Sequence, residues 1–290
     1  MEQVYFGYDD DIINPCWDNV FKAVFTKETP ESRGALQNLL SAIIGFDLEV
    51  TEIVANEPAV DNKNERQIRY DISCTLSDGT LCNIEMTLNP RDYEPVRLEY
   101  YVSKRFVSQE IRGTEKTYND LRPTYQIALI VNKSAFADNM YVHRFLYYDY
   151  INSISLGGKT RIITVELSKL DSIAEKQVPD MTPLERWSVF FRYTPDKTKR
   201  SLINEIIKSE EGIAMGAQIL LNVSKDEAER ARLLSEYKYE VDYQSDIESA
   251  RRETVAKYES ILASKDAELE SIKAENAKLL ARLNALQEPK

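Results

Sequence analysis

Two acidic residues of this chain could hold one cation between them. Asp71 and Glu85 lie in two segments whose alternating apolar and polar residues are typical of paired β-strands, and Ser77-Asp78-Gly79 lies between the segments. A three-residue loop with Gly79 in the left-handed conformation places Asp71 directly opposite Glu85. A two-residue Asp-Gly turn would mix the apolar and polar faces, so the pattern selects the longer loop. The apolar pairs of this register are Ile72 with Ile84, Cys74 with Cys82 and Tyr70 with Met86.

Directly opposed carboxylates destabilise a sheet, because their Cβ atoms are only roughly 5 Å apart. That cost indicates a counter-charge nearby, and a hard divalent cation bound through oxygens is one candidate. The alternative is a solvated polar face on which Arg69 or a nearby lysine pairs with the acids. Asp18 could add a third carboxylate, although an acid at the start of a helix commonly serves the helix dipole.

The composition excludes several other kinds of site. His143 is the only histidine, so a zinc site or a His-dependent catalytic triad is poorly supported. The three cysteines form no C-x-x-C unit and are expected to be reduced core thiols. No apolar run approaches the length of a membrane span, and the N-terminus is acidic rather than basic. We expect a cytoplasmic protein with no membrane contact and no small-molecule cofactor.

The net charge of -11 argues against simple electrostatic capture of nucleic acid, because phosphate binding needs a basic footprint. The charge is unevenly distributed, however, and residues 195–200 are locally basic. Such patches are more often solvated surface than a binding face.

Secondary structure follows from the periodicity of the apolar residues and from the turn and cap residues. The expected elements are helices over 17–27 and up to Gly45, a strand over 49–55, a loop over 57–67, the hairpin, a helix from Pro95 to Ile111 closed by Gly113, strands over 125–131 and 160–167, and a helix opened by Thr182, Pro183 and Glu185. This order predicts an α/β fold in which helices flank a mixed β-sheet.

The C-terminal segment carries a heptad repeat. Positions a are Val255, Leu262, Leu269, Asn276 and Leu283, and positions d are Tyr258, Lys265, Ile272, Leu279 and Leu286. An Asn at position a specifies register and favours two strands, so we predict a parallel coiled coil that forms a homodimer through residues 254–287. The alternatives are a single solvent-exposed helix or a helix that packs on the body. The predicted domains are residues 1–170, a helical region over 171–253, and this tail.

The motifs in their order resemble those of the PD-(D/E)XK nuclease family transposases, the group related to recombination-promoting nucleases. The similarity covers about residues 14–195. It includes Asp18-x-x-Phe21-Lys22-x-x-Phe25, Arg69-Tyr70-Asp71, Asp78-Gly79, Asn83-Ile84-Glu85-Met86, Arg97-x-x-Tyr100-Tyr101, and Trp187 with Phe190. The resemblance implies a restriction-endonuclease-like core with Mg²⁺, or Mn²⁺, held by Asp71 and Glu85. The backbone carbonyl of Met86 is a candidate third ligand.

One position departs from the family pattern. The family usually has E-x-Q and the wider superfamily E-x-K, where this chain has Glu85-Met86-Thr87. Threonine offers a hydroxyl but is shorter, so the change affects hydrolysis more than metal binding. Lys22 or Arg97 could supply the missing positive charge from a neighbouring helix. Arg97 and Tyr101 lie one helical turn apart and could face the hairpin as phosphate contacts.

The resemblance implies an Mg²⁺-dependent DNA endonuclease in which Asp71, Glu85 and Thr87 are the catalytic residues. A second hypothesis is a catalytically degenerate nuclease fold that binds DNA or protein and dimerises through its coiled coil. A third is a purely structural dimerisation protein with neither metal nor DNA affinity.

Overall fold

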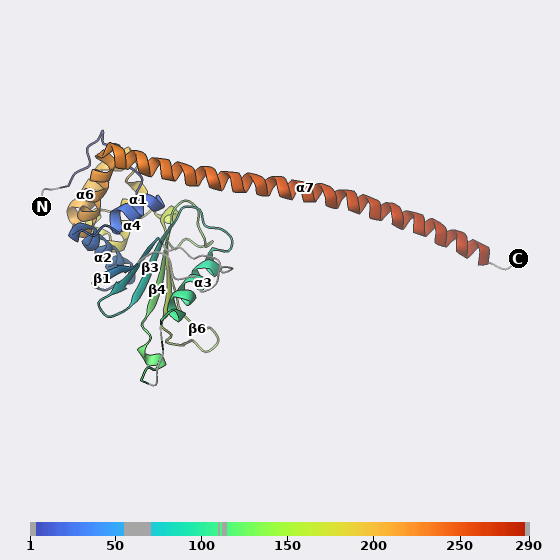
Figure 1. Ribbon diagram of the computed structural model, residues 1–290, viewed down its shortest axis with the longest axis horizontal. Helices are drawn as coiled ribbons and strands as arrows, with labels where there is room; N and C mark the ends of the chain where they lie inside the picture. The colour runs from blue at the N-terminus through green and yellow to red at the C-terminus, as the bar shows by residue number, and fades with distance from the viewer. Residues whose placement is uncertain (1–3, 55–70, 110, 112–114, 288–290) are drawn as a thin grey trace. The chain divides into compact units, whose positions relative to one another are not determined.

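A six-stranded mixed sheet organises the larger part of the protein, and helices cover both of its faces (Figure 1). The computed structural model describes residues 4–54, 71–109, 111 and 115–287. The chain divides into two compact units, Met1–Leu233 and Leu234–Lys290. The predicted α/β class with a mixed sheet is confirmed.

The sheet has the strand order β1-β2-β3-β4-β8-β5. Strands β3, β4 and β8 run parallel, and the remaining neighbours pair antiparallel. Parallel strands at the centre of a sheet are usually covered on both sides, which explains the apolar run of β4. The strands are β1 (Val50–Val54), β2 (Ile72–Leu76), β3 (Leu81–Thr87), β4 (Thr124–Ile130), β5 (Val142–Phe145) and β8 (Thr160–Glu166), and β6 (Tyr148–Asp149) and β7 (Ile154–Ser155) form a separate small ribbon.

Helix α3 covers one face of the sheet, and α1, α2, α4 and α6 lie on the other (Figure 1). The helices are α1 (Asp18–Phe25), α2 (Pro30–Ile44), α3 (Glu94–Val107), α4 (Pro183–Tyr193), α5 (Arg200–Ser209), α6 (Glu211–Lys225) and α7 (Glu227–Gln287). Short 3₁₀ turns occupy Tyr118–Asp120, Leu167–Lys169, Val178–Asp180 and Lys197–Lys199.

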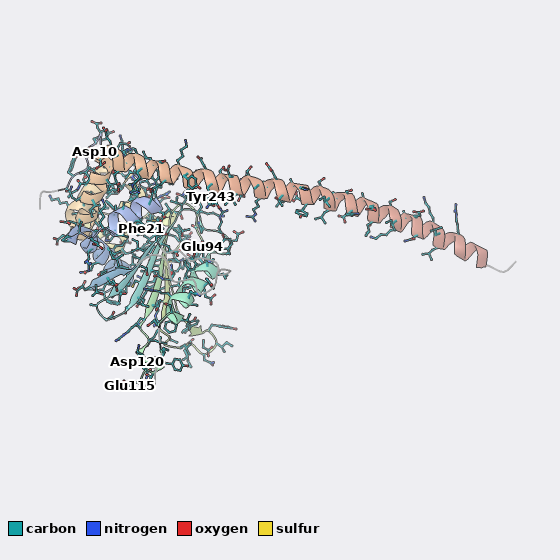
Figure 2. The ribbon with its side chains drawn as sticks, viewed as in Figure 1. Asp10, Phe21, Glu94, Glu115, Asp120 and Tyr243 are labelled. Atoms are coloured by element: carbon teal, nitrogen blue, oxygen red, sulfur yellow. The ribbon has the colours of Figure 1, made fainter. Side chains whose placement is uncertain are left out.

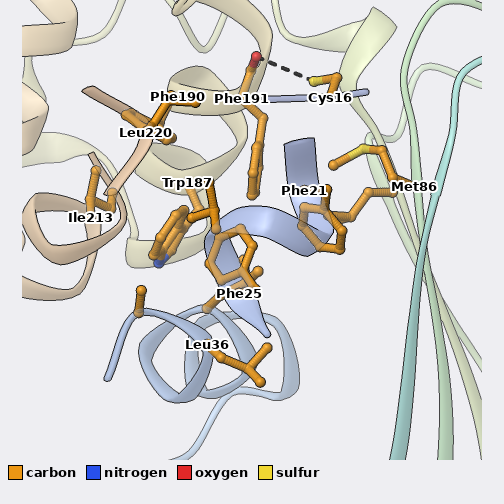
Figure 3. Packing of buried hydrophobic residues seen from close by; sticks show 14 of the residues in the cluster. Cys16, Phe21, Phe25, Leu36, Met86, Trp187, Phe190, Phe191, Ile213 and Leu220 are labelled. Carbon is orange, nitrogen blue, oxygen red and sulfur yellow. Dashed lines mark hydrogen bonds between the residues drawn. The ribbon is translucent and has the colours of Figure 1, made fainter. Parts of the chain in front are cut away.

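Trp187 of α4 lies at the centre of the main core and is fully buried (Figure 3). Its ring stacks on Phe191 at 5.5 Å between centroids and lies 5.8 Å from Phe25 of α1. Its indole Nε1 donates a 2.7 Å hydrogen bond to Asn38 Oδ1 of α2, so the one polar atom of the ring is satisfied. This residue therefore ties three helices together beneath the sheet.

The hairpin of β2 and β3 has the predicted register. Ile72 pairs with Ile84, and Cys74 pairs with Cys82. Gly79 adopts φ 82°, the left-handed conformation that the three-residue loop needs. The N–H of Leu76 donates to the Thr80 carbonyl at 2.9 Å and closes the loop.

The predicted ends of two helices are confirmed by their caps. Gly45 ends α2 in the left-handed conformation, with φ 100°. Thr182 and Glu185 form the capping box that opens α4, with Pro183 in its first turn.

Helix α3 differs from the prediction, because it ends at Val107 and not at Ile111. Beyond Val107 the side chain of Gln109 accepts from the N–H of Arg122 at 2.8 Å and donates to its carbonyl at 3.0 Å. These two hydrogen bonds hold the chain against the segment that leads into β4. The predicted closing residue, Gly113, lies outside the described residues, as does the predicted loop over 57–67.

Three short strands were not predicted. Strand β5 is an edge strand with half-buried and exposed residues, and β6 and β7 have two residues each. Segments this short carry too few residues for the alternation of a strand to show in the sequence.

Helix α7 is continuous from Glu227 to Gln287. Leu262, Leu269, Ile272 and Leu279, which occupy a and d positions of the predicted coiled coil, are exposed in the single chain. Among the described residues, no helix is both long and apolar enough to cross a membrane.

The packing of Trp187 generates a stability prediction. Replacing Trp187 with Ala removes a fully buried ring and leaves Asn38 without its donor, so the free energy of unfolding should fall by about 3–5 kcal/mol. Urea unfolding measures the change, and Tyr118→Ala, at a residue 82% exposed, is the control. A loss below about 1 kcal/mol for Trp187→Ala would contradict this packing.

Candidate active site

The β2–β3 hairpin places Asp71 and Glu85 at the same end of the sheet. Asp71 directly precedes β2, and Glu85 lies within β3 on the face that α3 covers. The N–H of Met86 donates to Asp71 Oδ2 at 2.7 Å. This hydrogen bond fixes the Asp71 carboxyl beside the strand that carries Glu85. The side chain of Met86 extends toward Phe21 on the opposite face, so only its backbone belongs to the site (Figure 3).

Glu85 is almost completely buried, with 3% of its side chain exposed. Its Oε2 lies 2.8 Å from Nη2 of Arg97. Both oxygens are buried and accept no hydrogen bond within the described part of the chain, so Oε2 meets Arg97 as an ion pair and Oε1 has no charged neighbour at that distance. A buried carboxylate oxygen without a partner is costly, so Glu85 has a free coordination position.

Arg97 reaches the site from the first turns of α3. Its Nη2 lies 2.5 Å from Glu94 Oε1 and 3.3 Å from Thr87 Oγ1. The guanidinium also lies over the ring of Tyr101, 5.1 Å from its centroid. Helix α3 therefore brings a positive charge to Thr87, two residues after Glu85.

Lys22 approaches the other carboxylate from α1. Its Nζ lies 2.8 Å from Asp18 Oδ2 and 3.5 Å from Asp71 Oδ1. Asp18 and Lys22 are one helical turn apart, which is the spacing for an ion pair along a helix. Among the residues that the structure describes, each of the two hairpin carboxylates thus has one basic neighbour, and these two neighbours come from opposite sides of the sheet.

Burial raises the pKa of both carboxyls. The pKa of Asp71 is raised to about 7, chiefly by loss of hydration and then by the Asp18 carboxylate, although Lys22 opposes the change. The pKa of Glu85 is raised to about 8 by burial, against the opposing effect of Arg97. Burial alone would lower the pKa of Lys22, but Asp71 and Asp18 raise it above its ordinary value. The basic neighbours therefore do not fully compensate the two acids.

A buried polar row continues the site across the same face of the sheet. Ser73 Oγ donates to Asn83 Oδ1 at 2.8 Å, and Asn83 Nδ2 donates to Gln126 Oε1 at 3.4 Å. All three side chains are buried, although sequence alternation suggested a solvated face for Ser73 and Asn83. Alternation along a strand does not show which elements cover its faces, so it could not predict this burial.

The structure brings together seven residues that the sequence suggested for the site. Asp71, Glu85, the Met86 backbone, Thr87, Lys22, Arg97 and Tyr101 are joined by the contacts above. Sequence reasoning missed Glu94, the first residue of α3, which is labelled in Figure 2. Its i, i+3 spacing from Arg97 is the signal that could have identified it. The Arg69 alternative for a counter-charge lies outside the described residues.

The residues fit a divalent cation held by two carboxylates. Mg²⁺ commonly uses one or two carboxylates together with water and phosphate oxygens. Ionised Asp18, Asp71, Glu85 and Glu94 carry two more charges than the two basic side chains that contact them. One divalent cation would match that excess. Within the described ranges no group of three or more His, Cys, Asp or Glu side chains is arranged as a metal cage.

Comparison with known proteins adds one finding. A family model described as PD-(D/E)XK nuclease family transposase matches residues 15–250. The matched range includes every element that carries the site and stops short of the predicted coiled coil. No curated protein and no solved structure matched the chain.

The raised pKa values predict how stability depends on pH without metal. Because the pKa of Asp71 is about 7 and that of Glu85 about 8 in the folded protein, against 3.8 and 4.5 ordinarily, the folded state binds more protons between about pH 4 and pH 8. Stability should therefore fall as the pH rises through this range. Glu85→Gln removes one of the two groups, so the variant should gain stability relative to wild type as the pH rises.

Chemical denaturation with EDTA at several pH values measures this difference. Glu52→Gln is the matched control, because Glu52 is exposed on β1. A difference between Glu85→Gln and wild type that stays constant from about pH 5 to pH 8 would show that Glu85 ionises normally.

Proposed function

The chain belongs to the PD-(D/E)XK nuclease family transposases, as its motifs indicated, and on this premise we propose that it is an Mg²⁺-dependent DNA endonuclease. Membership of the family implies the restriction-endonuclease-like fold and a nuclease or transposase function. The finer proposal is that the chain hydrolyses phosphodiester bonds at the end of the β2–β3 hairpin.

The observation that carries the proposal is the pair of poorly hydrated carboxyls, Glu85 buried and Asp71 partly buried. Asp71 and Glu85 have raised pKa values, and Oε1 of Glu85 has no hydrogen-bond partner within the described residues. Two like charges held in a water-poor site are unfavourable without further positive charge. A cation coordinated by both carboxylates would supply that positive charge.

We propose that Asp71, Glu85 and the Met86 carbonyl hold Mg²⁺, or Mn²⁺ in its place. When bound there, the ion would lower the pKa of a coordinated water molecule and would offset negative charge on the scissile phosphate. Asp71 is oriented for ligation by the Met86 N–H, and Glu85 by its place in β3.

Arg97 and Lys22 have a separate role toward DNA in this proposal. Arg97 contacts Thr87 and so brings a fixed positive charge to the position where the family usually has glutamine and the superfamily lysine. A guanidinium binds phosphate oxygens well, because its donors form a planar fork. Tyr101 stacks beneath Arg97 and limits its motion. Lys22 would offset phosphate charge on the Asp71 side.

A second function is favoured by the same basic residues. Lys22 and Arg97 already neutralise part of the acidic charge, and Thr87 replaces a longer side chain. A nuclease fold that binds DNA or protein without cutting would also have these features. Metal binding without cleavage would support this second function.

We also propose that the chain forms a homodimer through residues 254–287. The support is the heptad repeat on α7, in which Leu262, Leu269, Ile272 and Leu279 are exposed in the single chain. Such a dimer would join two nuclease units, so that two strands or two sites could be cut.

We place the protein in the cytoplasm, where DNA is available to it. The three cysteines are free and buried, including Cys74 and Cys82 on paired strands, as expected for a reducing compartment.

Plasmid nicking in Mg²⁺ tests the endonuclease proposal. Wild type should nick supercoiled DNA, and Glu85→Gln should be slower by at least about 100-fold, because loss of a ligand should exceed the 10–100-fold effect of losing a group that merely supports one. Glu52→Gln is again the control and should cut normally. Equal cutting by wild type and Glu85→Gln would refute the assignment of the site.

Thr87→Gln separates the two functions. If the wild type binds Mg²⁺ but does not cut, and Thr87→Gln does cut, the site is weakened at this one position. If wild type and Thr87→Gln both bind Mg²⁺ without cutting, the result supports the binding function instead.

Light scattering of the full chain tests the dimer. Wild type should have twice the mass of one 33.4 kDa chain. Leu262→Asp combined with Leu269→Asp places charges at two a positions and should give monomers. Ala267→Asp with Ala274→Asp changes two f positions of the same helix and should leave the dimer intact. Equal masses for both double variants would contradict a dimer interface formed by the a and d positions.

A further inference from the structure

One nitrogen of Arg97, Nη2, lies in contact with three side-chain oxygens. Nη2 lies 2.5 Å from Glu94 Oε1, 2.8 Å from Glu85 Oε2 and 3.3 Å from Thr87 Oγ1. These partners come from the start of α3 and the end of β3. The guanidinium therefore lies where the nuclease site and the helix meet.

The two acidic partners hold Arg97 in different ways. Glu94 also accepts from Nε of Arg97, at 3.2 Å to Oε1 and 3.3 Å to Oε2, so it grips one edge of the guanidinium through two nitrogens. Glu85 contacts Nη2 alone. Two-point contacts fix a guanidinium more firmly than a single one, so Glu94 is the anchoring partner.

Glu94 is suited to this task by its place in the fold. It is the first residue of α3, where the helix dipole favours a negative charge, and it is only 3% exposed. Burial excludes water that would compete for the guanidinium. The anchor is thus built into the same helix that carries Arg97.

We propose that Glu94 is a positioning residue that retains Arg97 beside Thr87 when a divalent cation takes Glu85. This inference rests on the proposed function, because it requires a cation at Glu85. The cation and Arg97 compete for the same carboxylate, which Arg97 contacts through Oε2. With Glu94 in place, Arg97 loses its contact with Glu85 and keeps its contacts with Glu94 and Thr87. Without the Glu94 carboxylate, Glu85 becomes the acidic partner that holds Arg97 and excludes the cation.

A double-mutant cycle in Mg²⁺ affinity tests the idea. Calorimetry with Mg²⁺ alone is performed on wild type, Glu94→Gln, Arg97→Met and the double variant. Glu94→Gln should weaken Mg²⁺ binding by about tenfold, because Arg97 then competes more strongly for Glu85. In the Arg97→Met background, the same Glu94→Gln change should have almost no effect.

Glu99→Gln is the matched control, because Glu99 is exposed on the same helix, and its affinity should equal that of wild type. If Glu94→Gln does not fold, Glu94→Asp replaces it in the cycle. Glu94→Asp keeps the charge at the start of the helix but withdraws it from Arg97 by one methylene, and it should also weaken binding.

The outcomes separate this inference from the proposed function. An equal loss of affinity from Glu94→Gln with and without Arg97 would mean that Glu94 acts by its own charge, and the inference would fail alone. Unchanged affinity in Glu94→Gln would also overturn it. If wild type binds no Mg²⁺, both the inference and the endonuclease proposal fall.

Discussion

Two neighbouring carboxyls, Glu85 buried in β3 and Asp71 partly buried just before β2, are the constraint that the rest of the site satisfies. Burial raises the pKa of both Asp71 and Glu85, and Glu85 contacts α3 through Arg97. Desolvated like charges need positive charge close by. The fold supplies it from two sides, with Lys22 on α1 and Arg97 on α3. These basic side chains offset only part of the charge, which leaves the site receptive to a divalent cation.

The same constraint explains why α3 matters more than its few apolar contacts suggest. Its inner face buries Leu98 against Ala128 and Ile130, but its first turns carry Glu94 and Arg97. The packing excludes water from the site and thereby strengthens each charge interaction within it. Helix α3 thus provides both the apolar packing on the sheet and the ion pairs of the site, and the position of Arg97 depends on both.

The sequence predicted the hairpin well, because two independent signals agreed there. The alternation of apolar residues fixed the faces, and Gly79 fixed the loop. The caps at Gly45 and Thr182 were predictable for the same reason, since each needs a particular residue type. The end of α3 was not predictable, because Gln109 bonds to Arg122, which is distant in sequence and carries no local pattern. Alternation likewise could not show that Ser73 and Asn83 are buried, since their cover comes from another element.

The site residues divide in a similar way. Asp71 and Glu85 were found from strand geometry, whereas Glu94 was missed because one acid at the start of a helix is ordinary. The most direct measurement of the central claim is a crystal structure of the protein soaked in Mn²⁺, with anomalous scattering used to locate the ion. We expect an anomalous peak within coordination distance of both Asp71 and Glu85, with Arg97 withdrawn from Glu85 and still held by Glu94. A fully occupied Arg97–Glu85 ion pair with no peak at the hairpin would contradict it.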